Sequence, residues 1–185
     1  SPKMPDSPVL HPLLPHAAPP APASLKLGAG FAWQPDGSLR LHYRLQGALD
    51  GLRLPPPAAP IPTDGLWQHT CCEAFITEGA GSPYREFNLA PSGAWAAYRF
   101  TGYRQRDTAW QPAAVPSIEC RRDGDSLWLV ADLPTALLPS VATRLGLTAV
   151  IETLADERSY WALHHAAPQA DFHLSASFTL PLNRP

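Results

Sequence analysis

Two glutamates on neighbouring predicted strands are the residues of this sequence with the clearest chemical potential. Residues 68–77 and 84–89 alternate apolar and polar side chains, and we expect them to pair as an antiparallel hairpin. We expect a register of that hairpin that places Glu73 opposite Glu86. Opposed carboxylates repel each other, so a shared proton, an arginine such as Arg104, a metal ion or a hydroxyl-bearing ligand must offset the cost. The pair therefore marks a candidate ligand surface.

The same register sorts the neighbouring side chains onto two faces, because alternate residues of a strand point to opposite sides of the sheet. Residues 95–101 continue the meander after a turn in which Gly93 takes a left-handed conformation. One face then mixes aromatic rings with carboxylates and an amide, as the walls of binding sites do. A solvated sheet face with surface glutamates is the alternative interpretation. The expected cross-strand pairs are Cys71–Asn88, Phe75–Tyr84, Tyr84–Phe100, Glu86–Tyr98 and Asn88–Ala96.

The composition favours one folded domain and argues against two classes of partner. The 185 residues are 45% hydrophobic, which is enough for a core, and 16% charged, with a formal net charge of −2. This balance provides neither a basic surface for nucleic acid nor a polybasic membrane patch. No apolar run approaches the ~18 residues of a membrane span, and the first residues lack the layout of a signal peptide. We expect neither a nucleic-acid nor a membrane partner.

The 23 prolines divide the chain unevenly. Residues 1–23 are rich in them and are expected to form an extended N-terminal arm, because proline excludes a helix and a central strand. A second proline-rich stretch, residues 54–62, is predicted to be a stiff loop that crosses between two β regions. Residues 24–182 are then predicted to form a single β-sandwich ligand-binding domain.

Short runs with an alternating pattern and turn residues between them make up most of that domain. About ten of them argue for an all-β fold, an antiparallel β-sandwich or closed barrel. Only residues 134–145 favour a helix, a short one that ends at Gly146. The expected strands are residues 25–33, 39–45, 68–77, 84–89, 95–101, 117–120, 126–131, 147–154, 159–164 and 172–180.

The three cysteines favour a reducing compartment. Cys71 and Cys72 are adjacent, and neighbours on a strand point to opposite faces, which opposes a disulfide between them. With Cys120 the number of cysteines is odd. We therefore expect a cytoplasmic protein.

One block of the sequence resembles a known family. Trp67, the strand Glu73-Ala-Phe-Ile and the stretch Tyr84-Arg-Glu-Phe-Asn-Leu-Ala-Pro-Ser-Gly-Ala-Trp are similar to the bacterial DOMON-like domains, distant relatives of the family 9 carbohydrate-binding modules. Tyr160-Trp-Ala-Leu-His-His and Asp171-Phe-His resemble a later region of the same proteins. The layout matches over residues 25–180, but only residues 67–104 are specific. The resemblance implies a β-sandwich whose concave sheet face holds a ligand, often a sugar and in some members a haem.

Sugar binding needs flat aromatic rings that stack on a pyranose and planar polar groups that bond its hydroxyls. This sequence offers both kinds of residue near the predicted face. We predict a non-catalytic domain that binds a carbohydrate or similar polyol as its partner, with no cofactor. The predicted ligand-binding residues are Trp67, Glu73, Tyr84, Glu86, Asn88, Tyr98, Arg104 and Trp161.

Four alternatives stay open at this point. A haem protein would need axial histidines, since the only methionine, Met4, lies in the arm. A metal could bind histidines near His173, or calcium could bind carboxylate and carbonyl oxygens, although no defined calcium loop exists. A glycoside-active enzyme could use Glu73 and Glu86 as acid and base. A protein-interaction domain would use the surface without any small ligand.

Overall fold

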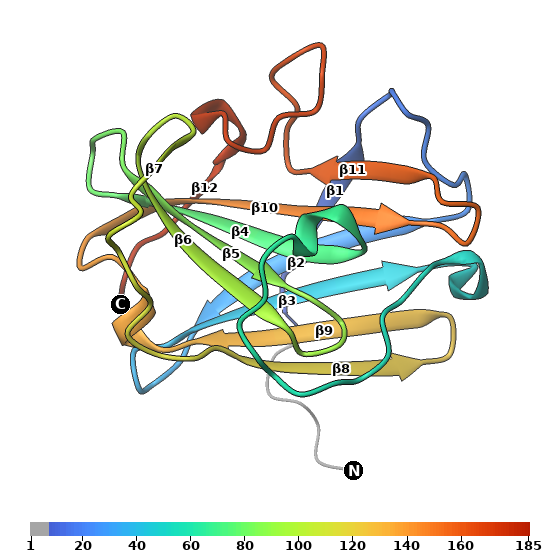
Figure 1. Cartoon of the computed structure of the whole chain (residues 1–185), viewed down its shortest axis with the longest axis horizontal. Coiled ribbons are helices and arrows are strands. Elements are labelled where there is room, and N and C mark those ends of the chain that lie inside the picture. The colour runs from blue at the N-terminus through green and yellow to red at the C-terminus, as the bar shows by residue number, and fades with distance from the viewer. Residues whose placement is uncertain (1–7) are drawn as a thin grey trace.

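The computed structural model describes residues 8–185, so the first seven residues of the predicted arm, including Met4, lie outside the described part of the chain. The described residues form twelve β-strands and four 3-10 helices (Figure 1). None of their helices is long and apolar enough to cross a membrane. The strands are β1 (His11–Pro15), β2 (Lys26–Trp33), β3 (Leu39–Gln46), β4 (Cys71–Glu78), β5 (Tyr84–Leu89), β6 (Trp95–Gly102), β7 (Gln105–Arg106), β8 (Ser117–Asp123), β9 (Ser126–Leu133), β10 (Ala142–Glu152), β11 (Arg158–Ala162) and β12 (Leu180–Pro181), and the helices are η1 (Leu49–Gly51), η2 (Leu66–Gln68), η3 (Thr135–Leu137) and η4 (Ser175–Ser177).

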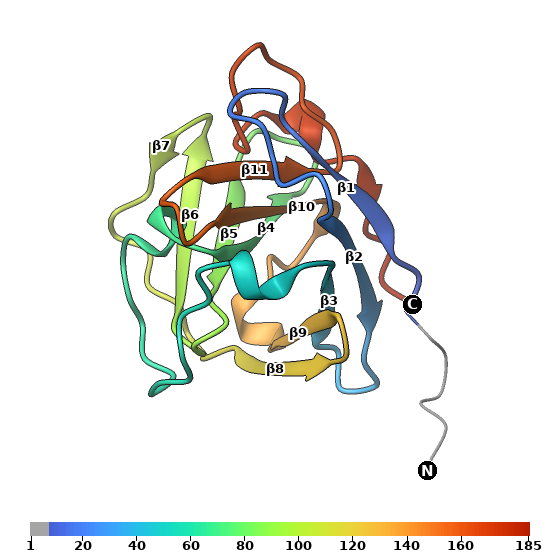
Figure 2. The same cartoon turned by 90° about the vertical axis from the view of Figure 1, so that its right-hand side faces the viewer.

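The strands follow one antiparallel path that folds back on itself into two layers. The order along the path is β7-β6-β5-β4-β10-β11-β1-β2-β3-β9-β8, with β12 paired to β10. Strand β1 joins the layers, since residues 11–13 pair with β2 and Leu14 and Pro15 pair with β11. Figure 2 shows β10 and β11 above β3, β9 and β8. The prediction of an all-β antiparallel sandwich is confirmed.

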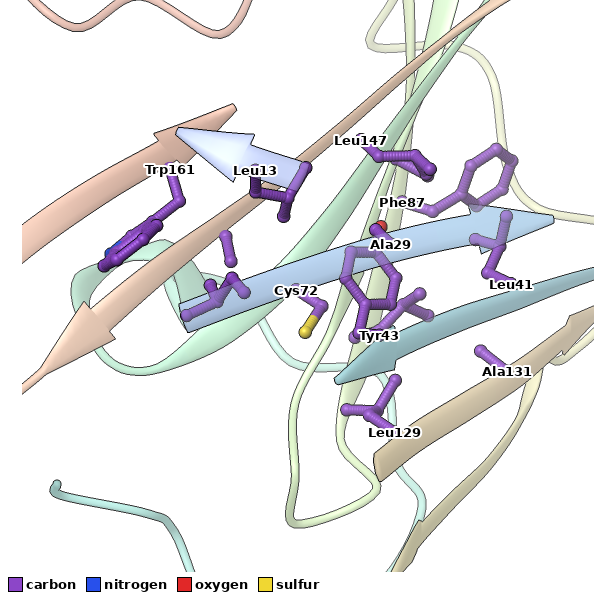
Figure 3. Packing of buried hydrophobic residues seen from close by; sticks show 14 of the residues in the cluster. Leu13, Ala29, Leu41, Tyr43, Cys72, Phe87, Leu129, Ala131, Leu147 and Trp161 are labelled. Carbon is purple, nitrogen blue, oxygen red and sulfur yellow. The ribbon is translucent and has the colours of Figure 1, made fainter. Parts of the chain in front are cut away.

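The main core lies between the two layers and fixes the orientation of β4, β5 and β10, which are called the site strands below because the first two carry Glu73 and Glu86. Side chains of β3 and β9 face those of β4, β5 and β10 across this space (Figure 3). Cys72 and Phe87 belong to this core, as the alternating pattern predicts. Tyr43, which is 1% exposed, donates a hydrogen bond from its hydroxyl to the backbone carbonyl of Glu73. The core therefore holds the backbone of β4 in place, and the Glu73 side chain points to the opposite face of the sheet.

Two predicted elements near the C-terminus are wrong. The helix expected over residues 134–145 is a single 3-10 turn, Thr135–Leu137, and β10 begins at Ala142. Pro139 explains this, because proline has no N–H to donate and disfavours helix in the residue before it. The strand expected over residues 172–180 is mostly loop, and only Leu180–Pro181 pairs, with β10.

The expectation that prolines exclude a central strand from the arm is also wrong for His11–Pro15, which lies between β11 and β2. Pro12 pairs only with β2 and Pro15 only with β11, so each proline has a single neighbour in the ladder. A proline is tolerated at such a position because its missing N–H can face the side on which no strand pairs with it. The division into an arm of residues 1–23 and a domain of residues 24–182 stays a prediction.

Gly146 shows how tightly the C-terminal segment is packed on the site strands. A Cβ atom at this position of β10 would lie 2.7 Å from Cδ1 of Phe178. We expect Gly146→Ala to lower the free energy of unfolding by about 1–3 kcal/mol, the usual cost of overpacking a core. Urea unfolding measures this change. Gly51→Ala, where nothing lies within 4 Å, is the control and should cost less than half as much.

Candidate functional site

A cleft of about 640 Å³ lies on the face of β6-β5-β4-β10-β11 that points away from the main core. Its floor is formed by strand residues and its walls by three connections. These are residues 64–67 around η2, the turn between β6 and β7, and residues 170–173 of the C-terminal loop. The lining residues are Asp64, Gly65, Trp67, Glu73, Glu86, Tyr98, Phe100, Arg104, Arg106, Val150, Tyr160, Ala170, Phe172 and His173.

The predicted face is present, but one of its two registers is shifted. Glu73 pairs with Asn88, and Phe75 pairs with Glu86, so the glutamates are diagonal neighbours rather than opposite each other. The β5–β6 register is as predicted, with Glu86 across from Tyr98. Strand β4 runs to Glu78, whose N–H donates to the carbonyl of Pro83, and Thr77 pairs with Tyr84. The expected pairing was wrong because strands that end at residue 77 and begin at residue 84 pair these two residues, which places Asn88 rather than Glu86 opposite Glu73. Because the shift is two residues, every side chain keeps its predicted face.

Five of the eight predicted ligand-binding residues line the cleft: Trp67, Glu73, Glu86, Tyr98 and Arg104. Tyr84 and Asn88 share the face but are fully covered, with 3% and 0% of their surfaces exposed. Trp161 is not brought to this surface. It points into the main core beside Leu13 (Figure 3), and its indole nitrogen donates to Ser159 Oγ at 2.8 Å.

The Glu73 carboxyl is buried with few hydrogen-bond partners. It is 2% exposed, and it accepts a bond from Thr148 Oγ1 at 3.2 Å and a weak one from the Cys71 thiol. Within residues 8–185, no arginine or lysine forms an ion pair with it. Burial, and then the negative charge of Glu86, raise the pKa of Glu73 well above its ordinary value. The burial of Glu73 therefore favours its protonated form, which can donate its hydroxyl at the floor of the cleft.

The Glu86 carboxyl is poised close to neutral pH. It is 6% exposed, and burial raises its pKa to about 7, while Asn88 and the guanidinium groups of Arg104 and Arg106 oppose the rise. Together with Glu73 it forms a pair that holds a proton over a wide pH range. One member is then a donor and the other a charged acceptor, which is the combination that binds a hydroxyl group most strongly.

His173 stands beside this pair as a neutral group. Its Nε2 lies 3.5 Å from Glu86 Oε1, but burial lowers the pKa of His173 to about 4, so the contact is not an ion pair at neutral pH. Tyr84 accepts a bond from the backbone N–H of Arg104 at 3.2 Å and lies 2.7 Å from His173 Nδ1. If its hydroxyl donates to Nδ1, the imidazole proton sits on Nε2 and points at Glu86.

Asn88 is buried on the cleft face of β5 but does not line the cleft. It is 0% exposed, and neither its amide nitrogen nor its oxygen makes a hydrogen bond of good geometry with any described residue. Its influence on the pKa of Glu86 shows that the two side chains are close. Asn88 therefore acts on the cleft through Glu86 and does not contact a ligand directly.

The rim of the cleft is held by a compact set of polar contacts. Asp171 accepts bonds from the Tyr103 hydroxyl, from Arg104 Nη2 at 2.9 Å and from the backbone N–H of His173 at 3.0 Å. These contacts tie the β6–β7 turn to the C-terminal loop. Across the cleft, the Tyr98 hydroxyl donates to Asp64, and the guanidinium of Arg106 lies 4.3 Å from the centre of the Tyr98 ring. Both walls are therefore fixed before any ligand arrives.

The sequence left several lining residues unidentified. Asp64, Phe172 and His173 lie in loops, where no periodicity assigns a face. Tyr160 could have been predicted from the alternation of side chains along β11. It pairs with Val150 on the cleft side of β10, while its neighbour Trp161 faces the core. No cluster of three or more His, Cys, Asp or Glu side chains suited to a metal ion occurs in the described chain.

The three thiols are not suited to act as nucleophiles, and only Cys71 contacts the site, through its weak bond to Glu73. Cys71, Cys72 and Cys120 are all free in the part of the chain that the structure describes, and the first two are buried on opposite faces of β4. Burial raises the pKa of Cys71 and of Cys72 well above the ordinary thiol value. Thiols in this state are poor nucleophiles.

Comparison with known proteins identifies the fold. No protein-family model matches this chain, and no curated protein matches it in sequence. Among solved structures, a candidate carbohydrate-binding protein from Bacteroides uniformis superposes with a TM-score of 0.68 at 16% identity, over 92% of this chain and 84% of that chain. A family 9 carbohydrate-binding module from Caldicellulosiruptor kristjanssonii, solved with cellotriose, has a TM-score of 0.52 at 12% identity, over 92% and 80% of the two chains.

Proposed function

We propose that this chain is a non-catalytic domain that binds a small neutral sugar or similar polyol in the cleft. The observation that carries the proposal is the floor of the cleft. Two buried carboxyl groups, Glu73 and Glu86, line it with fewer hydrogen bonds than they can make, and the covered Asn88 amide lies close to Glu86. Buried polar groups are normally satisfied, and such a deficit is expected where a ligand completes the set.

A neutral sugar fits this floor better than an ion does. Each hydroxyl both donates and accepts, so it can bond the Glu86 carboxylate and the Glu73 carboxylic acid at once. The lining of the cleft contains two acidic side chains, Asp64 and Glu86, and two arginines, Arg104 and Arg106. When Glu73 is protonated, these four charges sum to zero, so the lining has no net charge. Trp67, which is 53% exposed, offers a flat ring at the wall. Aromatic faces of this kind stack on the apolar side of a pyranose.

The structural neighbours support the same ligand class. One is described as a candidate carbohydrate-binding protein, and the other was solved with cellotriose. The finer assignment, a DOMON-like domain of bacterial origin, is part of this proposal and rests on the sequence block around residues 67–104.

A glycoside-active enzyme is the second candidate, and one observation favours it. Burial favours the protonated form of Glu73, while Glu86, with a pKa of about 7, is partly ionised near neutral pH; an acid and a nucleophile require this division. A screen of chromogenic glycosides tests this directly. Turnover that Glu73→Gln and Glu86→Gln both abolish would replace the binding proposal with an enzymatic one.

Removal of the exposed indole is expected to weaken sugar binding. Trp67→Ala should raise the dissociation constant about ten-fold, because an aromatic contact is worth about 1.5 kcal/mol. Calorimetric titration with glucose, xylose, cellobiose and myo-inositol measures the effect on whichever of them binds most tightly. Trp128→Ala is the matched control, since Trp128 is a half-buried tryptophan of β9 that lies against Arg44. Equal losses in the two variants would contradict a role for Trp67 in the site.

A further inference from the structure

A second hollow, of about 650 Å³, lies where the two layers of the sandwich meet, and it shares no residue with the sugar cleft. Strand β1 pairs with β2 as far as Leu13 and then pairs with β11 from Leu14 onward. The ladder between β1 and β2 therefore opens beyond Leu27, the partner of Leu13. The hollow lies at this opening, between the first residues of β2 and the proline-rich connection of residues 16–25.

The connection of residues 16–25 forms a wall of the hollow that is fixed in place by its own contacts. His16 donates its backbone N–H to the carbonyl of Tyr160 at 2.7 Å, and its Nε2 lies 3.1 Å from the carbonyl oxygen of Ala167. At the other end, the N–H of Leu25 donates to the carbonyl of Pro22 at 3.2 Å. Alanine and proline make up most of the residues between these ends, and neither loses side-chain entropy when it is ordered. The wall is therefore preformed and apolar.

Two cationic side chains reach the hollow from the sheet, Lys26 of β2 and Arg44 of β3. They lie on the same face, because Lys26 pairs with Gln46 while Gly28 pairs with Arg44. Gly28 places no side chain between them, and a Cβ atom at this position would lie 3.3 Å from Cβ of Leu10. Diagonal neighbours on one face of a sheet are about 7–8 Å apart, so a single anion can bond both side chains.

Both cations have donors that are open to a ligand. Lys26 is exposed and Arg44 is half-buried, and neither side chain forms a hydrogen bond or an ion pair with any residue between 8 and 185. The guanidinium carbon of Arg44 lies 5.5 Å from the centre of the Trp128 ring, and a contact with a ring face leaves the N–H groups at the guanidinium edge free. No acidic residue of the described chain lines the hollow, so its lining is positively charged.

We infer that this hollow binds a small organic carboxylate with an apolar body. Lys26 and Arg44 bond the carboxylate, whose two oxygens match the planar fork of a guanidinium. The apolar body lies against Leu10, Pro12 and Pro22, in a hollow whose volume is typical of small-molecule sites. Two cationic donors suit the two oxygens of a carboxylate better than the three free oxygens of a phosphate monoester. This inference does not depend on the proposed sugar function.

Titration with octanoate, at constant ionic strength and below its micellar concentration, tests the inference. The readouts are the ¹H–¹⁵N signals of the Gly28 backbone amide, which lines the hollow, and of the Trp128 indole beside Arg44. Both should shift saturably, with one dissociation constant on the order of a millimolar. Octanamide, which has the same body without the charge, should bind about ten-fold more weakly. Acetate, which has the charge without the body, should give no saturable shift over the same range.

Lys26→Met removes the charge but keeps a long side chain, and it should raise the dissociation constant of octanoate about ten-fold, the loss of one charge-assisted bond. Arg122→Met is the matched control, because Arg122 pairs with Asp50 on the surface and neither residue lines the hollow. This control variant should bind octanoate as tightly as the wild type does.

The carboxylate site is contradicted if octanoate gives no saturable shift at Gly28 and Trp128, or if octanamide binds as tightly as octanoate. Equal losses of affinity in Lys26→Met and Arg122→Met would contradict it as well. The Trp67 indole separates this result from the sugar proposal, because octanoate in this hollow should leave that signal unmoved. An octanoate shift at Trp67 without one at Gly28 would overturn the inference.

Discussion

Phe178→Ala is expected to lower the free energy of unfolding by about 3–5 kcal/mol, the usual cost of emptying a buried phenylalanine site. Phe178 is 2% exposed and stacks on Phe75 with ring centres 5.6 Å apart. It also packs against Tyr84 and is in close contact with Gly146. The side chain therefore anchors the loop before β12 to the site strands.

The same substitution should loosen one wall of the cleft. The C-terminal loop that carries His173 and Phe172 is held by this aromatic cluster and by the Asp171 contacts. Urea unfolding gives the free energy, and amide hydrogen exchange over residues 163–179 should show faster opening. Leu154→Ala, which truncates a side chain that is 57% exposed, is the control and should change stability by less than about 0.5 kcal/mol. A loss below ~1 kcal/mol for Phe178→Ala would contradict the packing described here.

Glu86→Gln is expected to raise the free energy of unfolding at neutral pH and to lower the affinity for the sugar. The pKa of Glu86 is about 7 in the folded state, against an ordinary 4.5, because burial favours the protonated form. In the wild type, the contribution of Glu86 to the free energy of unfolding is therefore complete below pH 4.5, and this contribution is lost as the pH rises toward 7. Glutamine does not ionise and loses nothing. At about 1.4 kcal/mol for each pKa unit, the variant should gain roughly 3 kcal/mol relative to the wild type between pH 4 and pH 8.

Measuring the difference between variant and wild type isolates this effect from other titrating groups. His173 has the opposite dependence, since its lowered pKa of about 4 removes stability as the pH falls below 6.5. The two contributions nearly cancel in the wild type between pH 4.5 and 6.5, so replacing Glu86 should expose the histidine slope. Glu119→Gln, which removes an exposed carboxylate of β8, is the control. Parallel stability curves for Glu86→Gln and the wild type would contradict the burial of an uncompensated carboxyl.

Sugar binding should change in the opposite direction. The ionised Glu86 accepts hydroxyl bonds more strongly than a neutral amide does, so Glu86→Gln should reduce affinity most at pH 8. A gain in stability with a loss of binding is the usual outcome when a strained functional group is removed.

The strand pattern was sufficient to predict which side chains share the cleft face. Glu73 and Glu86 share it in every register that differs by an even number of residues, so a two-residue error in the hairpin was harmless. The predicted strand ends also contained the correct pairing, since a hairpin that pairs Thr77 with Tyr84 places Asn88 opposite Glu73. Local pattern was therefore sufficient for the face and for the partner, and the expected pairing of Glu73 with Glu86 was a misplacement within it.

The walls of the cleft could not be predicted in the same way. His173 and Asp64 lie in segments without regular structure, and their positions depend on contacts made far along the chain. Trp161 was assigned to the site for its chemistry, yet alternation on β11 places Tyr160 there instead. Proline content also misled, because Pro12 and Pro15 each need only one partner in β1.

The side-chain amide of Asn88, which lies close to Glu86, provides the most direct test of whether a ligand binds at the floor of the cleft. Its two N–H signals can be followed by ¹H–¹⁵N correlation while glucose, xylose, cellobiose and myo-inositol are added in turn. At least one of these is expected to shift the Asn88 amide, through its neighbour Glu86, and the Trp67 indole together, saturably and with one dissociation constant. If every one of them leaves the Asn88 amide unmoved, or shifts only residues outside the cleft, the floor formed by Glu73 and Glu86 does not bind a sugar.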